Sequence, residues 1–251
     1  IYLSNKNKFL ISGSQGIGKT SLINIISKVL NKFYKKQTLL LSLDNYYLSK
    51  KERLYLSKRY HTLLETRGVP GTHNIKNLFI DIKKFENINY PLSLPLFDKL
   101  IDDVMDKKKI VKSKSDILFL EGWCCGCSPI EKKFLYKNVN YLEKVFDKNY
   151  KWRNYYNDKL KKEYKEIFDL FDIKIFIKSP SFKYVSKWRL KQELNNKSMS
   201  KKMNRMSPKE INNFIQYYEK ITKWMDKNYS KEADLIIKVD GNQKIKSING
   251  I

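Results

Sequence analysis

The chain has 251 residues, of which 41% are hydrophobic and 14% aromatic. These fractions exclude an intrinsically disordered chain, and the length predicts one domain with a sizeable core. The net charge of +25 comes from lysines dispersed along the whole sequence, which predicts a solvated basic surface and no specific nucleic-acid partner. Because no apolar run approaches the length of a membrane span and the first residues do not resemble a signal peptide, we expect a cytoplasmic protein without a membrane partner.

The predicted elements alternate between short strands and longer helices. Apolar runs predict strands at residues 9–13, 38–43, 116–120, 173–177 and 235–239. Helical spacing predicts helices at about residues 19–32, 50–60, 74–86, 151–170, 181–195 and 208–227. Residues 88–115 and 195–206 are the least regular. Apolar strands separated by long helices are typical of a mainly parallel sheet covered on both faces, so we expect a single three-layer α/β domain over residues 1–251.

The first predicted strand leads into a glycine-rich loop. Its sequence GSQGIGKT fits the pattern G-x-x-x-x-G-K-[ST] and lies between a strand and a helix. Backbone N–H groups of such a loop surround phosphate oxygens, and the helix N-terminus adds positive potential. We expect Lys19 to contact the β- and γ-phosphates and the Thr20 hydroxyl to bind Mg²⁺. The predicted nucleotide-binding residues are Gly13, Ser14, Gln15, Gly16, Ile17, Gly18, Lys19, Thr20 and Ser21.

Two carboxylates follow predicted strands at the edge of the sheet where this loop lies. Asp44 follows the second strand, where it would accept a proton from an attacking hydroxyl, coordinate Mg²⁺ or only cap the next helix. Glu121 follows the third strand in LFLEGW, at the place of a carboxylate that holds Mg²⁺ through water. Phosphoryl transfer depends mainly on positioning and charge stabilisation, so one proton acceptor, one metal ion and several cations are sufficient.

Two loops and one helix carry further candidate residues. The loop TRGVPGTH holds Arg67, whose guanidinium is suited to a carboxylate or phosphate, although an ordinary turn also fits the sequence. Asp98 and Lys99 follow an apolar stretch in LPLFDK, and on their own they indicate only a solvated loop. Arg189 precedes a basic stretch, which predicts either a lid over the phosphates or a surface ion pair.

The three cysteines, Cys124, Cys125 and Cys127, lie together just past the third predicted strand. A structural zinc site usually needs a second pair of ligands, and the two histidines are far upstream. We therefore expect reduced thiols that are buried or half-buried.

Six motifs occur in a familiar order: GSQGIGKT, SLDNYYL, RGVPGTHN, LPLFDK, LFLEGW and WRLKQE. Together they resemble the glycerate kinase-like P-loop proteins of the phosphoribulokinase, uridine kinase and pantothenate kinase superfamily. The resemblance covers essentially the whole chain, and RGVPGTH with EGW is specific to this branch. It implies a three-layer P-loop NTPase fold with a helical lid, and a phosphotransferase that uses ATP and Mg²⁺. The implied acceptor is a small hydroxy acid, D-glycerate, with 3-phosphoglycerate as the product.

The resemblance also implies roles for individual residues. Lys19, Asp44 and Arg189 are the implied catalytic residues, with Asp44 as the general base. Thr20 and Glu121 are the implied metal ligands, in part through water. The implied acceptor-binding residues are Asp44, Tyr47, Arg67, Gly71, Thr72, His73, Asp98 and Lys99. They lie in acceptor loops at about residues 62–76 and 94–104, and the lid lies at about residues 181–206.

The sequence leaves the identity of the phosphorylated acceptor undecided. Leu96 and Val104 stand where related sequences often carry a basic residue, so two cations near the acceptor are lost. One alternative is a kinase of another small acceptor, such as uridine, another nucleoside or pantothenate. The other is a nucleotide-dependent switch or a nucleic-acid-binding ATPase, although the chain lacks the N-K-x-D tetrapeptide by which GTPases usually bind guanine.

Overall fold

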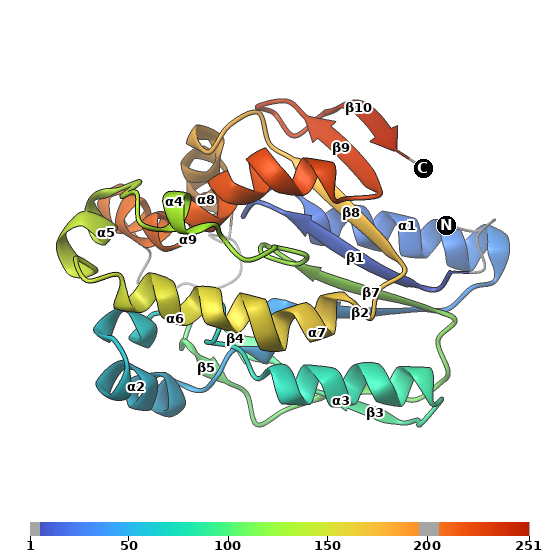
Figure 1. Cartoon of the computed structure of the whole chain (residues 1–251). Helices are drawn as coiled ribbons and strands as arrows, with labels where there is room; N and C mark the ends of the chain where they lie inside the picture. The colour runs from blue at the N-terminus through green and yellow to red at the C-terminus, as the bar shows by residue number, and fades with distance from the viewer. Residues whose placement is uncertain (1–5, 196–205, 251) are drawn as a thin grey trace.

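A six-stranded sheet runs through the middle of the computed structural model, which describes residues 6–195 and 206–250 (Figure 1). In spatial order its strands are β10 (Ile245–Gly250), β9 (Leu235–Val239), β8 (Ile173–Lys178), β1 (Lys8–Gly13), β7 (Ile117–Gly122) and β2 (Thr38–Ser42). All neighbouring strands pair in parallel except β10, which runs antiparallel to β9.

Side chains of the central strands alternate between two buried cores. On β7, Leu118 and Leu120 belong to one core, whereas Ile117 and Phe119 belong to the other. Because successive side chains of a strand point to opposite faces, this alternation means that both faces of the sheet are covered.

Helices form the layers on these two faces. The core that contains Phe119 is completed by α1 (Lys19–Tyr34) and by Trp188 of α8 (Lys183–Asn195). The opposite core is completed by α3 (Ile75–Glu86), α6 (Lys151–Lys159), α7 (Lys165–Phe168) and α9 (Pro208–Asn228). Figure 1 shows α6, α7 and α9 in front of the sheet and α1 behind it. The predicted three-layer α/β fold is therefore confirmed, and no helix within the described residues is long and apolar enough to cross a membrane.

The predicted strands and long helices are present, with three differences in detail. The helix predicted over 151–170 consists of α6, a π-helical turn (Leu160–Tyr164) and α7, and it ends at Phe168. Two short helices, α4 (Lys132–Leu135) and α5 (Tyr141–Phe146), and the edge strand β10 were not predicted.

The α-helix α2 (Lys50–Arg59) was predicted, and it begins at a capping box formed by Ser49 and Glu52. The extent of the domain and of its lid stays a prediction, and residues 196–205 of that lid lie outside the described residues.

The irregular segment 88–115 contains two small antiparallel sheets. β3 (Leu92–Leu94) pairs with β6 (Lys109–Val111), and β4 (Phe97–Asp98) pairs with β5 (Asp103–Val104). Strands of two or three residues leave no detectable alternation in the sequence, which explains why this segment looked irregular. The pairing of β4 with β5 closes the turn of residues 99–102.

The three cysteines follow β7 and are fully buried, with free thiols. Burial raises the pKa of each thiol above its ordinary value. The prediction of buried reduced thiols is confirmed.

A buried cluster of charges joins α5, α6 and α9. Arg153 Nε lies 2.7 Å from Asp147 Oδ2, and Lys220 Nζ lies 3.3 Å from Glu143 Oε2. These four side chains are almost completely inaccessible to water. Since a charge in a low-dielectric interior needs a partner, each member of the cluster depends on the others.

We expect Arg153→Met to lower the free energy of unfolding by about 3–5 kcal/mol, because it leaves buried carboxylates without their cation. Urea denaturation followed by tryptophan fluorescence measures this change. Arg59→Met is the matched control, since Arg59 lies on the surface of α2 and its loss should change stability by less than about 0.5 kcal/mol. Equal losses in the two variants would contradict a structural role for the buried cluster.

Candidate active site

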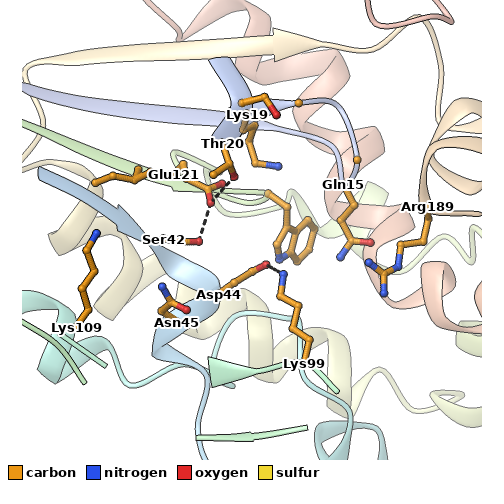
Figure 2. A pocket seen from close by; sticks show the side chains of 15 residues that line it. Gln15, Lys19, Thr20, Ser42, Asp44, Asn45, Lys99, Lys109, Glu121 and Arg189 are labelled. Carbon is orange, nitrogen blue, oxygen red and sulfur yellow. Dashed lines mark hydrogen bonds and ion pairs between the residues drawn. The ribbon is translucent and has the colours of Figure 1, made fainter. Parts of the chain in front are cut away.

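Parallel pairing brings three sequence motifs to one edge of the sheet. Ser12 of β1 pairs with Gly122 of β7, and Ser42 of β2 pairs with Glu121 of β7. The glycine-rich loop, Glu121 and Asp44 therefore leave the sheet side by side. A pocket of about 410 Å³ opens between them (Figure 2). Its lining residues are Gln15, Gly16, Gly18, Lys19, Thr20, Ser21, Leu40, Ser42, Asp44, Asn45, Lys99, Lys109, Glu121, Trp123 and Arg189.

The backbone of the loop requires glycine at two positions. Gly16 and Gly18 have φ values of 75° and 100°, which side-chain-bearing residues rarely adopt. A Cβ atom at Gly16 would lie 2.8 Å from the Cβ of Trp188, whereas one at Gly18 would have no atom within 4 Å. The loop is thus closed on the side of α8 and open at Gly18, toward the pocket.

The polar groups of the loop fit a phosphate. Lys19 Nζ donates hydrogen bonds to the carbonyl oxygens of Gly13 at 2.9 Å and Ser14 at 3.2 Å, which holds the ammonium group over the loop. Among the described residues, the buried Ser14 Oγ has no hydrogen-bond partner. Gln15 and Ser21 line the pocket, whereas Ile17 is buried in the core against α1. This arrangement offers donors and a cation to an anionic group.

Three side chains with oxygen atoms lie in contact next to the loop. Thr20 Oγ1 donates to Glu121 Oε1 at 3.2 Å, and Ser42 Oγ donates to the same atom at 2.7 Å (Figure 2). Within the described residues no group of three or more His, Cys, Asp or Glu side chains is arranged to hold a metal ion. Hydroxyl and carboxylate oxygens are nevertheless the donors that Mg²⁺ prefers, and Mg²⁺ usually keeps several water ligands. These three residues fit such an ion.

Both carboxylate oxygens of Asp44 are engaged. Tyr47 donates its hydroxyl proton to Oδ1 at 3.0 Å, and Lys99 Nζ donates to Oδ2. Burial alone would raise the pKa of Asp44, but the positive charges of Lys99 and Lys19 hold that pKa well below its ordinary value. Asp44 is therefore an ionised carboxylate in the pocket, next to two cations.

Arg67 is not among the residues that line the pocket, and its predicted role toward an acceptor stays a prediction. Its guanidinium is buried, forms an ion pair with Asp102 and lies 5.7 Å from the ring centre of Phe97 and 5.8 Å from that of Phe214. Arg67 also donates to the backbone carbonyl of Lys99 at 3.4 Å. These contacts of Arg67 hold the loop that carries Lys99.

Five other predicted acceptor residues, Tyr47 among them, also lie outside the lining of this pocket. Thr72 Oγ1 donates to the carbonyl of Val69, the Gly71 N–H donates to the Tyr164 hydroxyl, and Asp98 Oδ1 accepts the Leu100 N–H. His73 is buried behind Tyr47. Any role of these residues toward an acceptor stays a prediction.

The His73 ring packs against Tyr47, the residue that donates a hydrogen bond to Asp44. It stacks on Tyr47 with ring centres 4.4 Å apart, and its Nδ1 lies 2.6 Å from the hydroxyl of Tyr164. Burial lowers the pKa of His73 to about 3, although the negative charge of Asp44 acts in the opposite direction. His73 is therefore neutral and supports Tyr47 as an uncharged packing partner.

Sequence reasoning missed five residues that line the pocket: Leu40, Ser42, Asn45, Lys109 and Trp123. Ser42 and Asn45 flank Asp44, so their positions at a strand end carried a usable signal. Trp123 donates its indole N–H to the Gly68 carbonyl at 3.1 Å and joins the wall of the pocket to the RGVPGTH loop. Lys109 belongs to a three-residue strand and has no distinguishing pattern in a lysine-rich chain.

Residues 2–248 match the KAP family P-loop domain. The chain belongs to this family. It is 28% identical over 225 residues to the uncharacterized kinase mug58 of Schizosaccharomyces pombe, covering 83% of this chain and 76% of that protein. It is 27% identical over 255 residues to the probable ATP-dependent kinase TDA10 of Saccharomyces cerevisiae, covering 94% and 85%.

A solved structure of D-glycerate 3-kinase from Cryptococcus neoformans has a TM-score of 0.80 with this chain at 22% sequence identity. The likeness covers 98% of this chain and 90% of that one, so the two share the whole fold. The predicted P-loop kinase fold, with its nucleotide-binding loop, is therefore confirmed.

We expect the buried neutral His73 to make stability depend on pH. The unfolded histidine takes up a proton near its ordinary pKa of 6.5, whereas the folded one does so only near 3. Between these values the unfolded state binds more protons, so the free energy of unfolding falls as the pH falls, by up to about 1.4 kcal/mol per pH unit. Urea denaturation at pH 7, 6 and 5 measures this slope, which should be shallower in His73→Gln; identical slopes would contradict the assignment.

Proposed function

We propose that the protein is an ATP- and Mg²⁺-dependent kinase that phosphorylates a hydroxyl group of a small organic acid, with D-glycerate as the leading acceptor. The observation that carries this proposal is the placement of Asp44. Its ionised carboxylate lies in the same pocket as Lys19 of the P-loop and contacts Lys99. A proton acceptor beside a phosphate-binding loop is the arrangement that phosphoryl transfer to an alcohol requires. Relatives named as kinases support the same class of reaction.

On the nucleotide side, the open loop at Gly18 and the ammonium group of Lys19 would bind the β- and γ-phosphates of ATP. Thr20, Ser42 and Glu121 would hold Mg²⁺, directly or through water. When bound, this ion neutralises the charge that develops on the phosphate oxygens. Arg189 lines the pocket from α8 and would add a second cation near the transferred group.

On the acceptor side, Asp44 would act as the general base. The acceptor oxygen forms a bond to the γ-phosphorus while the bond from that phosphorus to the β–γ bridging oxygen breaks. ADP leaves with the electron pair, and the hydroxyl proton passes to the carboxylate of Asp44. Tyr47 orients this carboxylate through its hydrogen bond to Oδ1.

The choice of an acid as acceptor rests on the motif resemblance and on Lys99. Its side chain enters the pocket beside Asp44 and offers a positive charge to a carboxylate group. Leu96 and Val104 provide no positive charge. Outside the P-loop, the lysines that line the pocket are Lys99 and Lys109. In a small acid with a hydroxyl group close to its carboxylate, these two groups would lie at Asp44 and Lys99, which contact each other.

The test of the proposed function is ADP release from Mg²⁺-ATP with and without D-glycerate, followed by mass detection of the product. Acceptor-dependent release with phosphoglycerate formed supports the proposal. A panel that includes other hydroxy acids, uridine and pantothenate identifies a different acceptor. ATP binding without phosphorylation of any acid would overturn it.

Asp44→Asn should abolish phosphoryl transfer while ATP binding stays nearly intact, because the amide cannot accept the proton and the P-loop is unchanged. Steady-state turnover and ATP titration calorimetry measure the two properties separately. Unchanged turnover would exclude Asp44 as the general base.

Lys19→Ala should lower the rate of transfer by about 10²–10³ and weaken ATP binding, because it removes a cation from the phosphates. Lys28→Ala is the matched control, since Lys28 lies on the exposed side of the same helix. The control should keep wild-type turnover. A similar loss in both variants would indicate a general effect on α1 rather than a role in phosphate binding.

A further inference from the structure

We propose that Lys99 restrains the base Asp44 until an anionic acceptor draws it away, so that one lysine both selects the acceptor and permits catalysis. This inference rests on the proposed kinase function and adds a specificity-determining role to it. In Figure 2 the side chain of Lys99 extends toward the carboxylate of Asp44, across the floor of the pocket.

The contacts of Asp44 leave one oxygen for chemistry. Tyr47 comes from the same chain segment as Asp44, is buried and stacks on His73, so its hydrogen bond to Oδ1 is a fixed part of the structure. Oδ2 is held by Lys99, whose side chain is 47% exposed. The contact at Oδ2 is therefore the one that a ligand can replace without disturbing the core.

The backbone that carries Lys99 is held firmly. Asp102 forms ion pairs with both Arg53 and Arg67, and these two arginines are buried. Arg53 also donates to the Asp102 carbonyl at 2.7 Å, and Arg67 donates to the Lys99 carbonyl. A long flexible side chain on a fixed backbone can exchange one carboxylate partner for another while the turn stays in place.

Without an acceptor, the ion pair makes Asp44 a poor base toward water. An attacking water molecule would give ADP and inorganic phosphate by the same bond changes as the acceptor, with its proton passing to Asp44. Lys99 Nζ already occupies Oδ2, the oxygen that would receive this proton. The carboxylate of a bound acid offers Lys99 an alternative partner and leaves Oδ2 to receive the hydroxyl proton of the acceptor. A neutral alcohol offers no such exchange.

The experiment compares Lys99→Met with wild type in two assays. The first is inorganic phosphate release from Mg²⁺-ATP without acceptor, which should rise by about tenfold or more because Asp44 becomes available to water. The double variant Lys99→Met/Asp44→Asn should return to the low wild-type rate. Lys107→Met, which removes an exposed lysine of the same segment, should leave phosphate release unchanged.

The second assay compares D-glycerate with glycerol, which has the same carbon chain and no carboxylate. The preference for glycerate, measured as the ratio of the two kcat/KM values, should fall by about tenfold or more in Lys99→Met. Lys99→Arg keeps the charge and should retain both low phosphate release and the preference for the acid. A merely structural role of Lys99 would change neither the preference nor the hydrolysis by water.

The outcomes separate this inference from the proposed function. If wild type forms phosphoglycerate while Lys99→Met releases no additional phosphate, the inference is overturned and the kinase proposal stands. The same holds if the preference for glycerate over glycerol is unchanged. If wild type phosphorylates no acid, the proposed function fails, and phosphate release still decides whether Lys99 restrains Asp44, because that assay uses water alone.

Discussion

The hydrogen-bonded register between β7 and its two parallel neighbours is the constraint on which the site depends. It aligns the ends of three strands, so that the P-loop after β1, Glu121 at the end of β7 and Asp44 after β2 meet at one edge. A shift of one residue in β7 would turn Glu121 toward the opposite face of the sheet and separate it from Thr20 and Ser42. The two apolar cores oppose that shift, because it would exchange the β7 side chains between two cores that are each packed around the present ones.

Behind this edge, contacts of the RGVPGTH loop support residues that line the pocket. Trp123 binds the Gly68 carbonyl, Tyr164 bonds to His73, and Arg67 holds the turn of Lys99 through Asp102. Trp123 and Lys99, which line the pocket, are therefore held by contacts with this loop and with Asp102. Such support is what keeps polar groups within the small tolerances that catalysis requires.

Sequence patterns predicted the fold and its P-loop well, since both depend on local features. Apolar strand runs, helix periodicity and the GSQGIGKT loop each lie within one continuous stretch of sequence. The structure that such a stretch forms follows from hydrophobic burial and backbone conformation. The acceptor side depends on long-range pairing. Nothing local to Arg67 shows that Asp102 will neutralise it, and nothing local to Lys109 separates it from other lysines. The resemblance supplied Asp44 and Lys99 as a set, but their direct contact became visible only in three dimensions.

The burial of Cys124, Cys125 and Cys127 has a consequence for the chemistry that the protein tolerates. The thiolate is the form of cysteine that reacts with oxidants and alkylating agents, and it is scarce when burial raises the thiol pKa. These are the only cysteines of the chain. The strand that carries Glu121 therefore continues into a segment whose buried thiols are shielded from oxidants and alkylating agents.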